Sequence, residues 1–86
     1  MPAISRFFGV VIRMYIREHG VPHFHAQYGE YHASFAIATL ERLEGELPRR
    51  PRRDVLEWAA DHRAELFANW ALARAGQPPQ PIAPLE

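Results

Sequence analysis

Alternation of apolar and polar residues between positions 10 and 37 constrains the fold of this chain more than any other feature. In "VVIRMYIR" the even positions are apolar, while Arg13, Tyr15 and Arg17 lie between them. The same period of two returns in "HFHAQY" and in "YHASFAI". This period is typical of β-strands with one buried face, because successive side chains point to opposite faces of a sheet. Residues 2–37 are therefore predicted to form strands joined by turns.

The segment "YGEY" separates the last two of these strands and predicts their register. Glycine followed by a polar residue is typical of a two-residue type II′ hairpin, because glycine readily adopts positive φ at the first loop position. The preceding loop is expected at residues 18–22. The resulting cross-strand pairs are Tyr28 with Tyr31, Gln27 with His32, His25 with Ser34, Arg13 with Gln27, Tyr15 with His25, and Arg17 with His23.

This register separates the side chains into two faces, and a slip by one residue would mix them. The apolar face is expected to contain Val10, Ile12, Met14, Ile16, Phe24, Ala26, Tyr28, Tyr31, Ala33, Phe35 and Ile37. The polar face is expected to contain Arg13, Tyr15, Arg17, His23, His25, Gln27, His32 and Ser34.

Residues 51–75 are predicted to form one long helix that covers the apolar face. Apolar residues recur there at spacings of three and four. Pro51 suits a first helical turn, and Gly76 suits a C-terminal stop. The last eleven residues contain four prolines and predict an extended tail. Between sheet and helix, residues 38–50 include acidic side chains typical of a protected edge strand, or of an edge that docks a partner.

The predicted fold is α+β: a small antiparallel meander of three to four strands with one long C-terminal helix packed on one face. Residues 1–75 are expected to form a single domain, and residues 76–86 the extended Pro-rich tail. A chain of 86 residues buries about 60% of the surface that its unfolded form exposes. Because such a core is modest, a homodimer is compatible with the sequence.

Composition excludes several classes of protein. The chain contains no cysteine, which excludes disulfides and thiolate metal sites. No segment has the apolar run of a signal peptide or a membrane span, so a cytoplasmic location without membrane contact is expected.

Every basic side chain is arginine. A high genomic GC content explains this bias, and so does binding of phosphate, which arginine contacts in a bidentate manner.

The polar face is a candidate site because it gathers His23, His25 and His32. One interpretation is the solvated face of an antiparallel sheet. A second is a metal site, in which three imidazoles leave an open position on zinc. The expected register places no carboxylate on this face, which disfavours that site.

A third interpretation is a surface that binds RNA. Arg13 and Arg17 would contact phosphate, and Tyr15 would stack on a base. Histidine suits the acid and base of metal-independent RNA cleavage, because its charge changes near neutral pH.

A second candidate feature is "LPRRPRRD", which sets Arg49, Arg50 and Arg52 at the start of the predicted helix. A helix N-terminus ringed by arginine can seat a phosphate. The alternative is that the arginines pack along the surface and pair with neighbouring carboxylates.

Several motifs resemble a small bacterial family known as domain of unknown function 4160. They are "MPAISRFFGVVIRMY", "PHFHAQYGEYHASFAI", "LEGELPRR", "VLEWAADHRAEL" and "IAPLE". The resemblance covers essentially the whole chain. It implies a single-domain cytoplasmic protein and a partner encoded by a paired gene, as in a toxin–antitoxin module. It also implies lysine at the position of His32 in many members, which favours a basic face that binds phosphate.

The leading hypothesis is a small bacterial protein that binds RNA or another phosphate-bearing ligand, as the ribonuclease-like toxin of such a module. If the protein is an enzyme, we expect a metal-independent endoribonuclease without cofactor or metal. The expected catalytic residues are His23, His25, Tyr15 and Arg13. The expected phosphate-binding residues are Arg17, His32, Arg49, Arg50 and Arg52. The alternatives are a non-enzymatic protein-interaction module and a histidine-ligated divalent metal protein.

Overall fold

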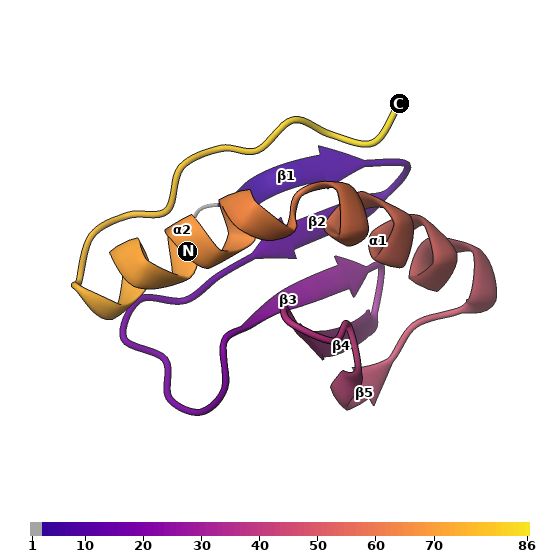
Figure 1. Ribbon diagram of the computed structural model, residues 1–86. Coiled ribbons are helices and arrows are strands. Elements are labelled where there is room, and N and C mark those ends of the chain that lie inside the picture. Colours follow the sequence, from indigo (N-terminus) through magenta and orange to yellow (C-terminus); the bar gives the residue numbers. More distant parts are fainter. Residues whose placement is uncertain (1–2) are drawn as a thin grey trace.

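The computed structural model describes residues 3–86, which form a single antiparallel sheet with two helices on one face (Figure 1). The strands lie in sequence order. The elements are β1 (Ala3–Phe7), β2 (Val10–Arg13), β3 (His23–Tyr28), β4 (Tyr31–Ala36), β5 (Arg42–Glu46), α1 (Arg49–Asp61) and α2 (Arg63–Arg74). The α+β class is confirmed, whereas the predicted three to four strands are wrong because the sheet has five.

The two outer strands are short and irregular, which explains why alternation alone does not count them. The register of β1 shifts between Ala3 and Ser5, so its apolar spacing departs from a period of two. In β5 every residue is exposed, which leaves no buried face to detect. Gly45 in β5 has φ +69°, and a Cβ there would lie 2.0 Å from the carbonyl oxygen of His32. Only glycine fits at this close approach of β5 to β4.

The register between β3 and β4 agrees with the prediction from Tyr28–Tyr31 through Phe24–Phe35. Gly29 has the expected positive φ of 59°. The predicted register between β2 and β3 is wrong by two residues. Arg13 pairs with His25 instead of Gln27, and the predicted pairs Tyr15–His25 and Arg17–His23 do not form because β2 ends at Arg13. The connecting loop therefore covers residues 14–22 instead of 18–22. A shift of two leaves each side chain of β2 on its predicted face, because the period of a strand is also two. Ile16 and Arg17 lie in the loop and on neither face of the sheet.

The prediction of one long helix is wrong, because His62 interrupts it between α1 and α2. His62 has φ −120° and ψ 23°, outside the helical region, and its N–H is shared between the carbonyls of Trp58 and Ala59. The interruption is a single residue, so the three- and four-residue spacing continues across it. The sequence pattern consequently gives no sign of the break.

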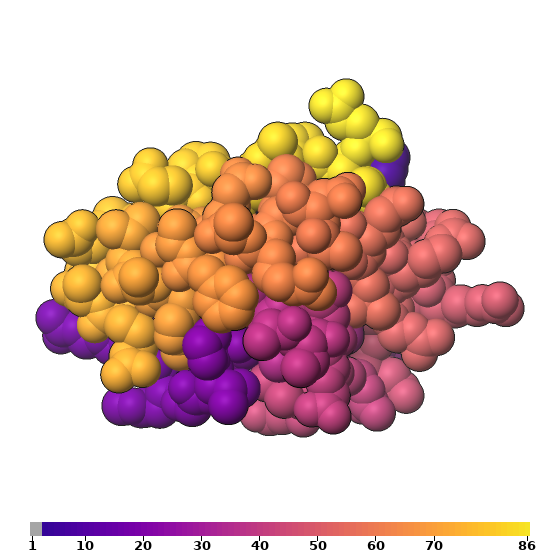
Figure 2. All heavy atoms as spheres, in the orientation of Figure 1, coloured from indigo at the N-terminus to yellow at the C-terminus, as the bar shows by residue number. Residues whose placement is uncertain are grey.

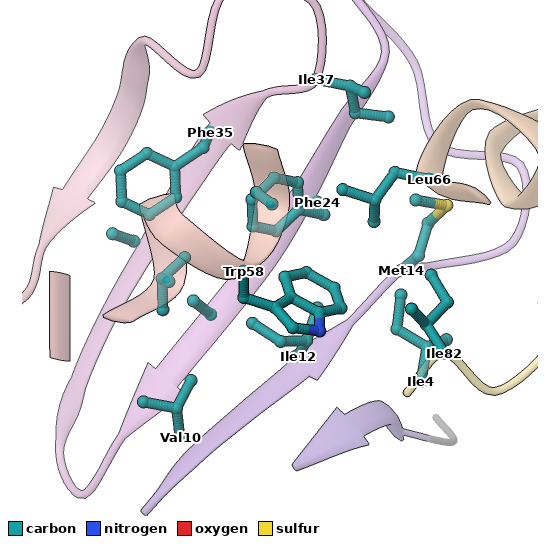
Figure 3. Packing of buried hydrophobic residues seen from close by; sticks show 14 of the residues in the cluster. Ile4, Val10, Ile12, Met14, Phe24, Phe35, Ile37, Trp58, Leu66 and Ile82 are labelled. Atoms are coloured by element: carbon teal, nitrogen blue, oxygen red, sulfur yellow. The ribbon is translucent and has the colours of Figure 1, made fainter. Parts of the chain in front are cut away.

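The core lies between the sheet and the helices (Figure 3). Trp58 of α1 is fully buried and packs near the ring of Phe24, which stacks on Phe35. Leu66 and Trp70 of α2 extend the cluster. Most of the predicted apolar face is buried, but Tyr31 is 53% exposed and Ile16 is 36% exposed, so both belong to the surface.

The proline-rich tail is extended and lies against the domain along the helices and β1 (Figures 1 and 2). Ile82 is buried in the core, and its N–H donates to the carbonyl of Ile4. The indole N–H of Trp58 donates to the carbonyl of Ala83, and Asn69 forms two hydrogen bonds with Gln80. The tail thus covers the free edge of β1. Neither helix in residues 3–86 has the length and apolar character needed to cross a membrane.

Candidate functional site

The polar face of the sheet, opposite the helices, brings together side chains from β2, β3 and β4. Cross-strand pairing places Arg13 beside His25, and Gln27 beside His32. A small depression on this face is lined by Val11, Arg13, Tyr15, His25, Ala26, Gln27 and His32. One cation, one phenol, one amide and two imidazoles therefore converge there.

Arg13 is held in place at the depression. Its Nη1 donates to Oε1 of Gln27 over 2.6 Å, and Nε2 of Gln27 donates in turn to the carbonyl of Gly29. These contacts fix the orientation of the Gln27 amide. A guanidinium has five N–H groups, so Arg13 keeps donors for an anionic ligand.

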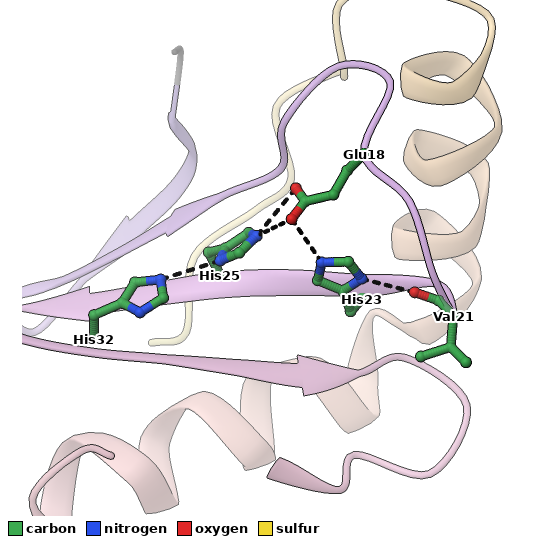
Figure 4. A network of polar contacts seen from close by, with 5 residues as sticks. All are labelled: Glu18, Val21, His23, His25 and His32. Atoms are coloured by element: carbon green, nitrogen blue, oxygen red, sulfur yellow. Dashed lines mark hydrogen bonds and ion pairs between the residues drawn. The ribbon is translucent and has the colours of Figure 1, made fainter. Parts of the chain in front are cut away.

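The loop between β2 and β3 adds Glu18 to the site. Arg17 has φ 62°, a left-handed conformation that reverses the chain, and its N–H donates to the carbonyl of Ala73 at the end of α2. The reversal directs Glu18 back over β3, where its carboxylate meets His23 and His25 (Figure 4). The predicted absence of carboxylates from this site is therefore wrong, because the prediction extended β2 through Arg17.

Glu18 and the three histidines form a continuous polar network. Oε1 of Glu18 lies 2.9 Å from Nε2 of His23 and 2.9 Å from Nε2 of His25. On the other side of its ring, Nδ1 of His25 lies 3.0 Å from Nε2 of His32. Nδ1 of His23 donates to the carbonyl of Val21 over 2.7 Å. The side chains of Glu18, His23 and His25 are each at most one-quarter exposed, whereas His32 is exposed.

Burial and hydrogen bonding alter the acidity of this network. Burial lowers the pKa of His25 below its ordinary value, although the hydrogen bond to Glu18 acts in the opposite direction. Burial alone would raise the pKa of Glu18, but hydrogen bonds from His23 and His25 hold it below its ordinary value. Glu18 is therefore an anion at neutral pH.

Aromatic rings support the network. The ring of Tyr15 meets the ring of His25 edge-on at a centroid distance of 4.6 Å. The ring of His23 packs against Trp70 of α2 at 5.2 Å and against His25 at 5.1 Å. The four residues expected to be catalytic, Arg13, Tyr15, His23 and His25, are thus neighbours. Their catalytic role stays a prediction.

The polar face is less basic than the sequence indicates. β5 pairs with β4 so that Glu46 lies opposite His32 and Glu44 opposite Ser34. Directly opposed residues of an antiparallel pair share a face. Two carboxylates therefore stand at the β5 side of the histidines, and the cationic part of the face is confined to the β2 side.

The remaining arginines expected to bind phosphate are not at this site. The guanidinium of Arg17 lies against the C-terminal end of α2, close enough that a Cβ on Gly76 would be 2.9 Å from its Nη2. Arg49, Arg50 and Arg52 lie in the first turn of α1, in the helix layer. Arg50 is engaged there: it pairs with Asp54, donates to the carbonyl of Phe8 and lies over the ring of Tyr28.

Sequence reasoning missed Glu18 as a member of the site. Its position five residues before His23 is compatible with many loop conformations. Only the reversed backbone at Arg17, anchored on α2, brings its carboxylate to both imidazoles. A weak sequence signal exists, since Glu18 is the last acidic residue before the His-x-His strand.

Comparison with known proteins identifies one family. The model described as "Domain of unknown function (DUF4160)" matches residues 9–71, the larger part of the chain. The match covers β2 through most of α2, including every residue of the network, and it confirms the resemblance seen in the sequence motifs. No curated protein and no solved structure matches the chain.

Proposed function

This chain belongs to the DUF4160 family, and we propose that it binds RNA or another phosphate-bearing ligand on the polar face of its sheet. The observation that supports the proposal is the depression lined by Arg13, Tyr15, Gln27, His25 and His32. Its groups are hydrogen-bond donors and aromatic rings, which are the groups that proteins use for phosphate and unstacked bases.

Arg13 carries the electrostatic part of the proposal. Its guanidinium is fixed by Gln27 and stands beside the imidazoles, away from the carboxylates of Glu44 and Glu46. A phosphate oxygen at the depression would accept from Arg13 and from a ring N–H of His32. Tyr15 lies close enough to His25 to offer the edge of a stacking surface.

We extend the proposal to the activity that the sequence predicts, a ribonuclease-like toxin with a partner from a paired gene. His23, His25, Tyr15 and Arg13 are the proposed catalytic residues. Arg13 would stand at the developing charge of a bound phosphodiester and stabilise the transition state there.

Fluorescence anisotropy with a labelled single-stranded RNA tests binding. We expect Arg13→Gln to weaken binding at least about tenfold and to lower the salt dependence of log K by about one ion. Arg74→Gln is the matched control, because it removes the same charge from an exposed position at the end of α2. Equal affinity of Arg13→Gln and wild type would contradict the proposed site.

A second pair of variants asks whether the helix end takes part. Arg49 and Arg52 are exposed, and neither forms an ion pair within residues 3–86. If the polar face alone binds RNA, the double substitution Arg49→Gln and Arg52→Gln will weaken RNA binding no more than the removal of two positive charges elsewhere on the surface does. A larger effect than that of Arg13→Gln would place binding at α1 instead.

Expression in bacteria without the partner gene tests the toxin activity. We expect growth arrest and cleaved RNA for wild type, and neither for His25→Gln. His25 is chosen because His23 is more buried and packs on Trp70, so that its substitution would also disturb the core. Normal growth of cells that express folded wild-type protein would argue against a toxin and would favour the interaction module.

A further inference from the structure

We infer that Glu18, His23 and His25 form a binding site for a divalent transition-metal ion. Their donor atoms, one carboxylate oxygen and two imidazole Nε2 atoms, all lie within 4.8 Å of one another. The inference goes beyond phosphate binding and does not rest on it. It also differs from the sequence-based metal site, because Glu18 takes the place expected for His32.

The hydrogen bond from His23 to the carbonyl of Val21 turns Nε2 of the same ring toward Glu18. A carbonyl oxygen can only accept, so Nδ1 of His23, 2.7 Å from the carbonyl of Val21, must carry the proton. In the neutral ring, Nε2 then presents a lone pair to Oε1 of Glu18, which is also an acceptor, at 2.9 Å. Two lone pairs at that distance repel each other. A metal ion between these atoms would accept both lone pairs.

His25 is arranged in the same way. Its Nδ1 faces Nε2 of His32, which can accept a proton from it, and its Nε2 faces the same carboxylate at 2.9 and 3.1 Å. Metal-binding histidines typically donate their second ring N–H to a carbonyl or another acceptor, which fixes the ring and its tautomer. Val21 and His32 supply those acceptors here, so both rings are already oriented with Nε2 toward one point (Figure 4).

The two nitrogen–oxygen spacings among the donor atoms fit a small cation. With bonds of about 2.1 Å to nitrogen and oxygen, two ligand atoms are about 3.0 Å apart at a right angle and about 3.4 Å apart at the tetrahedral angle. The two nitrogen–oxygen distances of 2.9 Å therefore need to change by no more than a few tenths of an ångström. Glu18 is on a loop, which permits this adjustment.

The ligand set determines the class of metal. Two imidazoles and one carboxylate suit zinc, iron(II), cobalt(II) or manganese(II), whereas calcium and magnesium prefer oxygen ligands. Three protein ligands leave coordination positions open for water or substrate. A divalent ion with one carboxylate would also add a net positive charge to a face on which Glu44 and Glu46 offset the charge of Arg13. With the metal bound, His23 and His25 would act as metal ligands, and any chemistry at this site would depend on the metal.

Titration calorimetry of chelator-treated, full-length protein with zinc chloride tests the inference. We expect one zinc ion per chain for wild type, and a loss of affinity of at least about 100-fold for Glu18→Gln. His19→Ala is the matched control, since His19 is an exposed histidine of the same loop, and it should bind as wild type does. Because His32 acts only through His25, His32→Ala should weaken binding by about 10- to 100-fold.

Cobalt(II) absorption gives a second measurement that does not depend on activity. A visible ligand-field band should develop with wild type and His19→Ala and be absent with Glu18→Gln. Glu18→Gln preserves shape, and its amide can donate to Nε2 of His23, so the variant should remain folded by circular dichroism. Absence of stoichiometric zinc binding by wild type, or unchanged zinc binding by Glu18→Gln, would overturn the inference. RNA anisotropy repeated in chelator separates the two proposals, because RNA binding can persist when metal binding fails.

Discussion

Substitution of Ile82 by alanine tests whether the proline-rich tail is part of the folded domain. Ile82 is 6% exposed within the core cluster, and its N–H donates to Ile4 of β1. The substitution removes three carbon atoms, which is about 2.4 kcal/mol at about 0.8 kcal/mol per methylene. A cavity adds to this, but the tail at the edge of the core can relax into it. We therefore expect the free energy of unfolding to fall by about 2–3.5 kcal/mol.

Such a loss is large for a chain of 86 residues, whose total stability is expected near about 4–13 kcal/mol. It corresponds to a fall in melting temperature of about 10–20 °C. Urea unfolding followed by tryptophan fluorescence measures the change. Both Trp58 and Trp70 are buried in the core, and Trp58 is also hydrogen-bonded to Ala83 of the tail.

Ala83→Ser is the control for Ile82→Ala, because its side chain is exposed while its carbonyl still accepts from Trp58. It should unfold within about 0.5 kcal/mol of wild type. A change below about 1 kcal/mol for Ile82→Ala would refute the argument. The tail would then be the separate appendage that its composition indicates.

Three further predictions concern the sheet and the network. Gly45→Ala should destabilise the protein by at least about 1–3 kcal/mol in urea unfolding, because of the left-handed backbone at Gly45 and its contact with the carbonyl of His32. An unchanged unfolding midpoint would contradict the close approach of β5 to β4. Ser5→Ala should leave the melting temperature unchanged or raise it, because the hydroxyl is buried without a partner within residues 3–86. In chelator-treated protein the free energy of unfolding should fall on acidification. Folding lowers the pKa of His25 below its ordinary 6.5 and that of Glu18 below its ordinary 4.5, so the unfolded chain binds more protons. The loss should therefore begin below pH 6.5, continue below pH 4.5, and be smaller at the first step in His25→Gln.

The strand pattern allowed much of the sheet to be predicted. Alternation assigned His25, Gln27 and His32 to one face, and "YGEY" set the register of β3 and β4. Both features depend on local backbone geometry, which neighbouring residues determine. The same local logic placed Trp58, Leu66 and Trp70 on the buried side of the helices.

Errors arose where a distant contact decides the conformation. β2 ends at Arg13 and not at Arg17, because the loop reverses at Arg17 and bonds to Ala73 of α2. Alternation alone continues through that point. The interruption at His62 is hidden for a similar reason, since one non-helical residue leaves the spacing of apolar side chains intact.

The sequence by itself determined the α+β class, the division into an apolar and a polar face, and the gathering of histidines on the polar one. These follow from periodicity, which is a property of consecutive residues. The tertiary structure alone decided that Glu18 contacts His23 and His25 and that Glu44 and Glu46 lie on the same face. It also decided that the tail covers the free edge of β1. Each depends on contacts between segments far apart in the chain, and so on the packing of the whole domain.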